Sequence, residues 1–315
     1  MLQYLVIILD DTSSSFCHYT VGRKKSKLIE LDTLRRSIRF AMVENLTIQF
    51  VYPDYDLPQE YKNVIETIDH TNIKSLVYAD DETDIIVIDG WDFNDSKLND
   101  SITVIRTTWA HLFANQDKAK SLLGKVQRLN IVITDVDRMT DEDRQQYKSL
   151  LAQISQALET LYIEGHSPQL NLLTDRMMLT EMNNCGAGDS TITLAPNGKF
   201  YVCPGFYYDD EQNSVGDLEK GLEIKNKQLY RLDHAPICRK CDAWQCKRCV
   251  WLNRKTTFEV NTPSYEQCVI AHLERNTSRD LMLSLRSKGT FLPEREMIEE
   301  INYLDPFDEI INNRL

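Results

Sequence analysis

Seven of the eight cysteines in this 315-residue chain lie in one stretch, between residues 185 and 268. Thiolates are soft ligands that suit zinc and iron–sulfur clusters, and in a reducing compartment such a dense group binds metal more often than it forms disulfides. The stretch therefore predicts a metal-binding region. Its candidate ligands are Cys185, Cys203, Cys238, Cys241, Cys246, Cys249 and Cys268.

The densest part of this stretch contains two Cys-x2-Cys pairs, Cys238–Cys241 and Cys246–Cys249, with four residues between them. Zinc ribbons usually separate two such pairs by about 15–20 residues, so that two loops approach the ion from opposite sides. Four thiolates in so short a run are more easily shared between two centres than closed on one ion. Iron–sulfur clusters, zinc and a structural or redox-active group of thiols all remain open at this point.

The beginning of the chain, Met1 to Asp10, is apolar but short, and it lacks the basic leader of a signal peptide. No stretch reaches the ~20 apolar residues that span a bilayer. We therefore expect a cytoplasmic protein. The net charge of −12 disfavours nucleic acid and anionic membranes as partners, and it favours a cationic peptide or a basic protein.

In the first 175 residues, segments with the pattern of β-strands alternate with segments that have the period of amphipathic helices. The predicted strands are 2–9, 47–52, 73–78, 84–89, 102–106, 129–134 and 170–173, and the predicted helices are 31–46, 57–68, 111–126 and 140–162. This alternation indicates an α/β fold with a parallel sheet. Periodicity leaves open whether the sheet is a partial barrel or doubly wound.

The pattern changes after residue 184, where cysteine, glycine, proline and aromatic residues become frequent. Ile192 to Cys203 predicts a hairpin that turns at Pro196-Asn-Gly198. Long helical patterns are scarce until Asp280. Because this region has so little apolar core of its own, bound metal would have to contribute to its folding.

The order of the cysteines resembles the SPASM domain, the auxiliary-cluster module of many radical S-adenosylmethionine (radical SAM) peptide-modifying enzymes. The similarity rests on seven cysteines and Gly198, spaced Cys185-x12-Gly198-x4-Cys203, then Cys238-x2-Cys241-x4-Cys246-x2-Cys249, then Cys268. The resemblance implies two [4Fe-4S] clusters, the first of which has one iron without a cysteine ligand. It implies that the first is held by Cys185, Cys203 and Cys249, and the second by Cys238, Cys241, Cys246 and Cys268.

The N-terminal half is similar to the radical SAM barrel, but its catalytic motif is degenerate. That family places Cys-x3-Cys-x2-Cys after the first strand, and these three thiolates leave one iron for S-adenosylmethionine. Here Ser13 and Thr20 stand at the outer positions, and only Cys17 is a cysteine. Tyr52-Pro-Asp-Tyr55 stands where the family has a Gly-Gly-Glu-Pro-like turn. S-adenosylmethionine is therefore not expected as a cofactor.

This resemblance sets the expected domains: a partial (β/α) barrel of radical SAM type at 1–180, a small SPASM-like iron–sulfur domain at 181–275 and a helical tail at 276–315. Cys17 is then a remnant of the motif, a pocket thiol that contacts a peptide, or a partly buried small side chain. A nucleophile–base pair with His18 is disfavoured, because adjacent residues at a strand end point in opposite directions.

The whole chain is also similar to a narrower group, the maturases of CXXX-repeat peptides, through the opening Leu9 to Tyr19, the seven cysteines and residues 299–307. This similarity implies a cysteine-rich, ribosomally made precursor peptide as partner. Three hypotheses follow. The chain is a pseudoenzyme that presents the peptide, or passes electrons, to a radical SAM partner; an enzyme whose open iron captures a peptide thiolate; or a zinc-stabilised binding module.

Overall fold

A nine-stranded sheet forms the centre of the computed structural model, which describes residues 2–22, 25–289, 291–292 and 294–299. The strand order is β7-β6-β5-β4-β3-β2-β1-β8-β9, and every neighbouring pair is parallel except β8 and β9. The strands are β1 (Tyr4–Ile8), β2 (Thr47–Val51), β3 (His70–Ser75), β4 (Ile85–Asp89), β5 (Ile102–Thr107), β6 (Arg128–Ile133), β7 (Gln169–Leu170), β8 (Thr191–Leu194) and β9 (Phe200–Tyr201).

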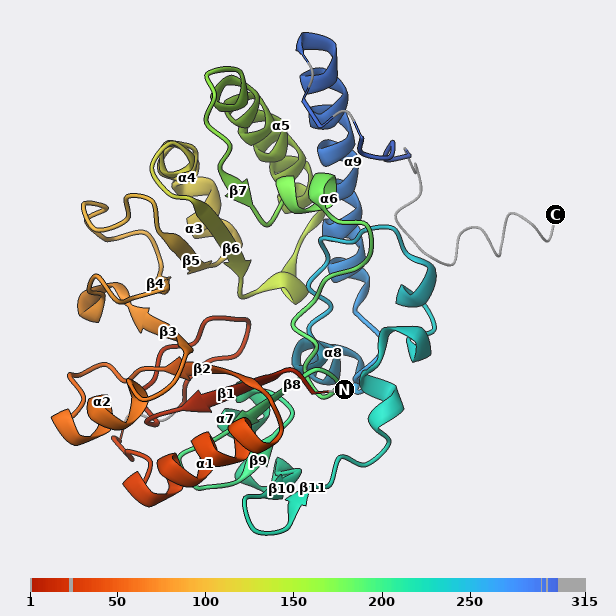
Figure 1. Ribbon diagram of the computed structural model, residues 1–315. Coiled ribbons are helices and arrows are strands. Elements are labelled where there is room, and N and C mark those ends of the chain that lie inside the picture. The colour runs from red at the N-terminus through yellow and green to blue at the C-terminus, as the bar shows by residue number, and fades with distance from the viewer. Residues whose placement is uncertain (1, 23–24, 290, 293, 300–315) are drawn as a thin grey trace.

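The order of the strands identifies the type of sheet. In a doubly wound sheet the strand order reverses at a switch point, whereas β1 to β7 follow one another across the sheet in chain order. Figure 1 shows the result as an open arc, with helices along its outside and the C-terminal segments at its mouth. The predicted α/β partial barrel is therefore confirmed, and the doubly wound alternative is wrong.

Helices of very different length connect and cover the strands. They are α1 (Leu31–Val43), α2 (Gln59–Ile65), α3 (Trp109–Ala114), α4 (Gln116–Leu123), α5 (Asp141–Ile163), α6 (Thr174–Met178), α7 (Pro204–Asp209), α8 (Val250–Thr257) and α9 (Tyr265–Lys288). A capping box between Thr140 and Asp143 begins α5, as its acidic first turn suggests. The predicted helix 111–126 is two helices, α3 and α4, which meet at Asn115.

Both faces of the sheet carry buried side chains, which explains why strands such as β1 and β4 are nearly continuous apolar runs. Leu5 and Ile7 of β1 pack in the outer core with residues of α1 and α2. Val6 points to the other face, where it packs with Val51, Ile73, Val87 and Val104. Phe16, from the loop after β1, packs against this inner layer. These residues form an apolar layer inside the arc.

The predicted hairpin joins the two halves of the chain. β8 pairs with β1 in parallel, and β9 pairs back on β8. Gly198 lies in the turn with a φ of 76°, which a residue without Cβ adopts readily. The cysteine-rich segment therefore extends the barrel's own sheet. The domain boundaries at 180 and 275 stay a prediction.

Helix α9 packs beside α5 on the outside of the barrel (Figure 1). It begins at Tyr265, earlier than the sequence pattern suggested, and its N-terminal cap is Ser264, whose side chain accepts a hydrogen bond from the Gln267 amide. Residues 300–307, part of the C-terminal resemblance, lie outside the described residues. Across the described ranges, no helix combines the length and apolar character needed to cross a bilayer.

Candidate metal centres

The eight cysteines all lie in described segments, and none of them is in a disulfide. The fold brings four of them to one pocket of about 410 Å³, whose walls come from both halves of the chain. One lies in the loop after β1, one before β8, one at the start of α7 and one at the start of α8. These four are Cys17, Cys185, Cys203 and Cys249.

Burial and mutual contact set the protonation of these four thiols. A hydrogen bond with Cys249, together with the positive groups of His18 and Arg106, lowers the pKa of Cys17 despite its burial. The same hydrogen bond and burial raise the pKa of Cys249. Burial raises the pKa of Cys185 to about 11, although the residue is accessible through the open pocket. If more of these thiols lost their protons, the added negative charge would require a cation, such as a metal, to offset it.

The backbone around Cys17 is fixed by a buried arginine of the barrel. Arg106, on β5, donates from Nε to the Cys17 carbonyl at 2.8 Å and from a terminal nitrogen to the Tyr19 carbonyl at 2.7 Å. Ser15 donates to the same Tyr19 carbonyl at 2.5 Å. Because three donors hold the Cys17 and Tyr19 carbonyls, the backbone on both sides of His18 is fixed, and the Cys17 side chain has a defined direction.

The same loop docks on α7, which follows Cys203. The Tyr207 hydroxyl donates to the buried Asp11 carboxylate, and the Tyr19 and Tyr208 rings stack with centroids 5.7 Å apart. These contacts connect the barrel loop to the cysteine-rich half on both sides of Cys17. Ser13, at the first position of the degenerate motif, is buried and donates to the Val51 carbonyl at 2.9 Å.

The other four cysteines form a second group beside α9. Burial raises the pKa of the Cys246 thiol, and the charges of the three neighbouring thiols raise it further. The group contains Cys238, Cys241, Cys246 and Cys268. His272 lies beside it, with Nε2 3.5 Å from the Cys241 Sγ, and burial lowers the His272 pKa to about 4.

Positive side chains surround this second group. Arg248 is almost fully buried and hydrogen-bonds to the Cys238 thiol. Arg275 and Arg176 both act to lower the pKa of Cys241, against the larger effect of burial. These cations offset part of the charge that thiolates would carry. The region would otherwise combine several buried negative charges in a low-dielectric environment.

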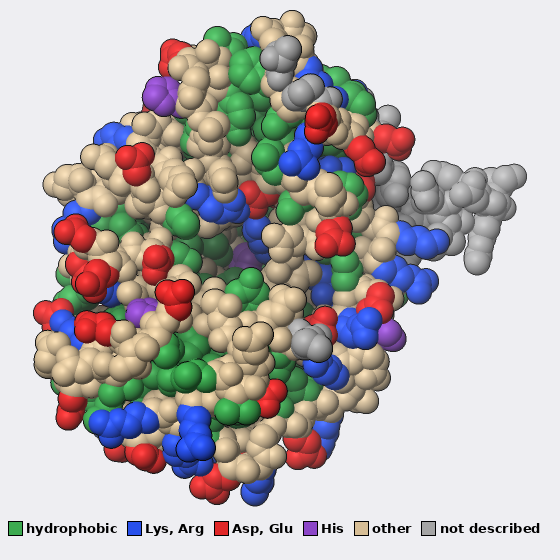
Figure 2. All heavy atoms as spheres, in the orientation of Figure 1, with side chains coloured by type: hydrophobic (Ala, Val, Ile, Leu, Met, Phe, Trp, Pro, Cys, Tyr) green, Lys and Arg blue, Asp and Glu red, His purple; other side chains and the backbone are tan. Residues whose placement is uncertain are grey.

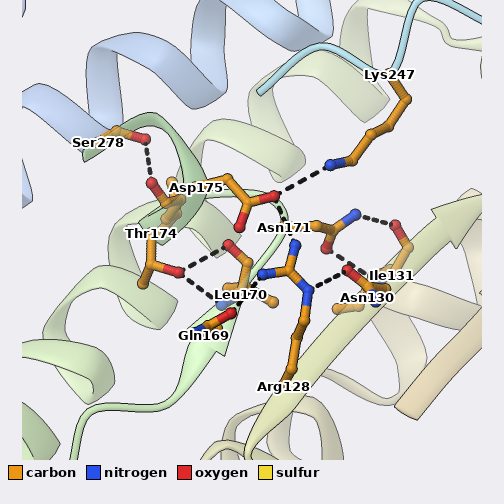
Figure 3. Close-up of polar contacts among 11 residues, drawn as sticks. Arg128, Asn130, Ile131, Gln169, Leu170, Asn171, Thr174, Asp175, Lys247 and Ser278 are labelled. Carbon is orange, nitrogen blue, oxygen red and sulfur yellow. Dashed lines mark hydrogen bonds and ion pairs between the residues drawn. The ribbon is translucent and has the colours of Figure 1, made fainter. Parts of the chain in front are cut away.

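Asp175 of α6 joins the second Cys-x2-Cys pair, Cys246–Cys249, to the barrel. Its carboxylate accepts hydrogen bonds from Lys247 at 3.0 Å and from Arg128 of β6 at 2.7 Å, as Figure 3 shows. Lys247 directly follows Cys246 and lies two residues before Cys249, so this contact positions a cysteine of each group. The Ser278 hydroxyl of α9 also donates a hydrogen bond of 2.8 Å to the Leu173 carbonyl, next to α6.

The chemistry and the number of the thiols bear on the kind of metal that could be bound. Within the described parts of the chain, no three His, Cys, Asp or Glu side chains are arranged to hold a single metal ion. Tetrahedral zinc would need its thiolates to converge on one point at about 2.3 Å. An iron–sulfur cluster instead binds each thiolate at a different iron and is ligated by four cysteines. Two groups of four thiols fit this donor requirement.

A second pocket of about 410 Å³ adjoins both groups. Its wall includes Cys185, Cys246 and Cys249, residues of the barrel interior, and Phe16 and His18. Figure 2 shows one face of the molecule hollowed near its centre, with hydrophobic side chains in the hollow. His18 Nδ1 lies 3.0 Å from the Ile133 carbonyl, so His18 and Cys17 contact different partners.

Sequence reasoning predicted seven of these cysteines as metal ligands and left Cys17 apart. The available signal was the total of eight cysteines, since two four-thiolate clusters need eight ligands. The role of Arg106 in holding the loop had no local signal, because its contacts depend on tertiary structure.

Several solved structures share this fold. His-tagged anSMEcpe, an anaerobic sulfatase-maturating enzyme of the radical SAM/SPASM type solved with bound AdoMet, has a TM-score of 0.61 at 11% identity, over 93% of this chain and 97% of that one. Native anSMEcpe with bound AdoMet and the Cp18Cys peptide also has a TM-score of 0.61, at 12% identity, over 91% and 100%.

Streptococcus suis SuiB with its precursor peptide SuiA covers 73% of this chain and 64% of that one at 13% identity, but its TM-score of 0.41 supports no argument. No protein-family model and no curated protein sequence matches the chain. At these identities the comparison establishes the fold alone. The chain therefore has the fold of the radical SAM/SPASM enzyme anSMEcpe.

Proposed function

We propose that this chain is an iron–sulfur protein that binds a cysteine-rich CXXX-repeat precursor peptide and presents it to a radical SAM partner, without cleaving S-adenosylmethionine itself. The observation that carries the proposal is a pair of four-thiol groups beside a barrel whose own motif loop has one cysteine. The chain combines the ligands of auxiliary clusters with a degenerate catalytic motif.

The chemistry of the donors supports two clusters. Each group consists of thiols alone, which are the preferred ligands of iron–sulfur clusters. Cys185, Cys203 and Cys249 would hold the first cluster. The second would be held by Cys238, Cys241, Cys246 and Cys268. When bound, such clusters supply one-electron transfer.

The motif loop supports the absence of S-adenosylmethionine cleavage. Catalysis in the radical SAM family requires three thiolates from this loop, and Ser13 and Thr20 occupy two of the positions. The Ser13 hydroxyl already bonds to the Val51 carbonyl, inside the protein. The Cys17 thiol contacts Cys249 in the cysteine-rich half.

The peptide would bind in the pocket that adjoins both thiol groups. Its size lies within the range of about 300–1,000 Å³ that is usual for ligand pockets, and its largely apolar wall is accompanied by the amides of Asn183, Asn184 and Gln245. Apolar walls with a few fixed polar groups suit a short peptide segment. The peptide in the anSMEcpe structure, a protein of similar fold, also supports this class of ligand.

The experiment is anaerobic purification of the full chain, followed by iron, sulfide and zinc analysis. We expect about eight irons per chain. The protein is then incubated with a synthetic peptide of several CXXX repeats, and with S-adenosylmethionine and a reductant. We expect saturable binding of the peptide and no 5′-deoxyadenosine.

The control peptide has serine in place of every cysteine. A colourless zinc protein would remove the iron–sulfur proposal. Formation of 5′-deoxyadenosine, or modification of the peptide by this chain alone, would contradict the pseudoenzyme. Equal affinity for the CXXX-repeat peptide and its serine variant would contradict a role in recognising the cysteines of the repeats.

A further inference from the structure

Cys17 is the one cysteine that the proposed ligand sets leave out, yet it lies with the first of them. It lines the same pocket as Cys185, Cys203 and Cys249 and is hydrogen-bonded to the Cys249 thiol. The other cysteines of the chain form the second group. A four-iron cluster is ordinarily held by four thiolates, so the first group needs one more ligand.

We propose that Cys17 is the fourth thiolate of the first cluster, so that this cluster has no open iron. The inference rests on the proposed function, because it requires that the first group holds a cluster. It changes one expectation from the sequence, in which three cysteines left one iron free to capture a peptide thiolate.

The loop that carries Cys17 is held in place independently of any metal. Arg106 binds the Cys17 and Tyr19 carbonyls from the barrel side. On the opposite side, Tyr207 and Tyr208 of α7 contact Asp11 and Tyr19. Because α7 begins directly after Cys203, the same contacts fix the position of Cys17 relative to another member of the group. A ligand set held this way is arranged before the cluster binds.

A role for Cys17 in a catalytic cluster does not fit this arrangement. Such a cluster would need thiolates at the positions of Ser13 and Thr20. Ser13 is buried with its hydroxyl on the Val51 carbonyl, whereas Thr20 is exposed. The two positions lie in different environments. The structure instead directs the single remaining thiol toward the cysteine-rich half.

The consequence for function is that the peptide would be bound by side chains of the pocket and not by an open iron. The N-terminal loop would also be tied to the C-terminal half by a metal–thiolate bond. Loss of the first cluster would then free the loop after β1.

The first test compares Cys17→Ala with Ser14→Ala, a change in the same loop that removes no thiol and no residue of the pocket wall. Anaerobically purified proteins are analysed for iron and sulfide, and the reduced clusters are recorded by electron paramagnetic resonance with and without added 2-mercaptoethanol. We expect Cys17→Ala to lose about one iron of eight, or to keep it with a spectrum that now changes on adding the thiol. The Ser14→Ala and wild-type spectra should not respond.

A second test uses the unmodified protein and does not depend on the folding of a variant. The chain is treated with iodoacetamide before and after iron removal, and mass spectrometry measures the alkylation of each cysteine. Cys17 should be alkylated only after iron removal, together with Cys185. Alkylation of Cys17 in the loaded protein, at the rate found after iron removal, would overturn the inference.

Failure of the proposed function and failure of the Cys17 assignment give different results. Wild-type protein without iron defeats both the proposed function and the role of Cys17. Wild-type protein with about eight irons, and a Cys17→Ala variant with the same iron content and the same thiol-insensitive spectrum, defeats the role of Cys17 alone.

Discussion

The Tyr147 hydroxyl of α5 donates a hydrogen bond of 2.5 Å to the carboxyl group of Glu274 on α9. Both side chains are buried where these two helices pack. Burial raises the pKa of Glu274 to about 8. The charge of Asp175 also raises this pKa, whereas the hydrogen bond from Tyr147 and the charge of Lys247 lower it. The interface that fixes α9 beside the second group of thiols therefore contains a carboxyl group that stays protonated near neutral pH.

Replacing Glu274 by glutamine should change how stability depends on pH. Between its ordinary pKa near 4.5 and the raised value near 8, Glu274 binds more protons in the folded than in the unfolded state. The free energy of unfolding therefore falls as pH rises through this window. We expect the Tm of Glu274→Gln minus that of the wild type to be a few degrees higher at pH 8 than at pH 6. A free-energy difference of 1 kcal/mol corresponds to about 2–4 °C in Tm.

Thermal unfolding under anaerobic conditions measures this difference. Glu164→Gln, a change at an exposed glutamate after α5, is the matched control and should follow the wild type at both pH values. Equal Tm differences at pH 6 and pH 8 for the Glu274 variant would show that the buried carboxyl does not titrate in this range.

Asp175→Asn should loosen the link between the barrel and the segment that carries Cys246 and Cys249. The side chain is only 11% exposed and accepts from both Lys247 and Arg128, so its charge is matched by two partners. Removing one charge from a buried network costs about 1–3 kcal/mol. Chemical denaturation should show this loss, and hydrogen exchange should increase in residues 245–249.

The comparison for this variant is Asp117→Asn. Asp117 pairs with Lys120 on the surface of α4 and is 91% exposed, so the change should cost about 0–1 kcal/mol. If the two variants lose the same stability, the contact at Asp175 is an ordinary surface ion pair.

Gly205→Ala should separate two helices that begin at cysteines of the first group. A Cβ at Gly205 would lie 2.7 Å from ring atoms of Trp251. Because these atoms belong to a rigid ring and not to the end of a flexible side chain, the clash cannot be relieved by a small side-chain movement. Gly205 lies in α7, after Cys203, and Trp251 lies in α8, after Cys249. Overpacking of this kind costs about 1–3 kcal/mol, and we expect iron to be lost faster on exposure to a chelator.

Gly22→Ala is the control, because no atom lies within 4 Å of the Cβ it would add. Iron release is followed by absorbance in the presence of a chelator. Equal release rates for the two alanine variants would mean that contact between α7 and α8 does not hold the first group together.

Removing the metal should expose one region selectively. Between Glu211 and Lys240, only Ala235 and Cys238 are buried, so this segment has almost no core of its own. The barrel strands, by contrast, are buried on both faces. Iron chelation should therefore increase proteolysis and hydrogen exchange in 211–248 while β1 to β6 stay protected. Uniform loss of protection, or none, would contradict a structural role of the metal.

The sequence by itself determined the local elements and the number of possible ligands. The strand 4–8 belongs to an apolar run that ends at Asp10, and Thr140 with the acidic residues after it marks the start of α5, so short-range patterns were enough. The short separation of the two Cys-x2-Cys pairs also favoured two centres over one ion.

Only the tertiary structure decided how these parts meet. The order of the strands depends on pairing between distant segments, which distinguishes the partial barrel from a doubly wound sheet. The position of Cys17 depends on contacts from Arg106 and from α7, far away in the sequence. Periodicity reports which face of an element is buried, but not against which partner, and for that reason the fourth thiol of the first group was found only in the folded chain.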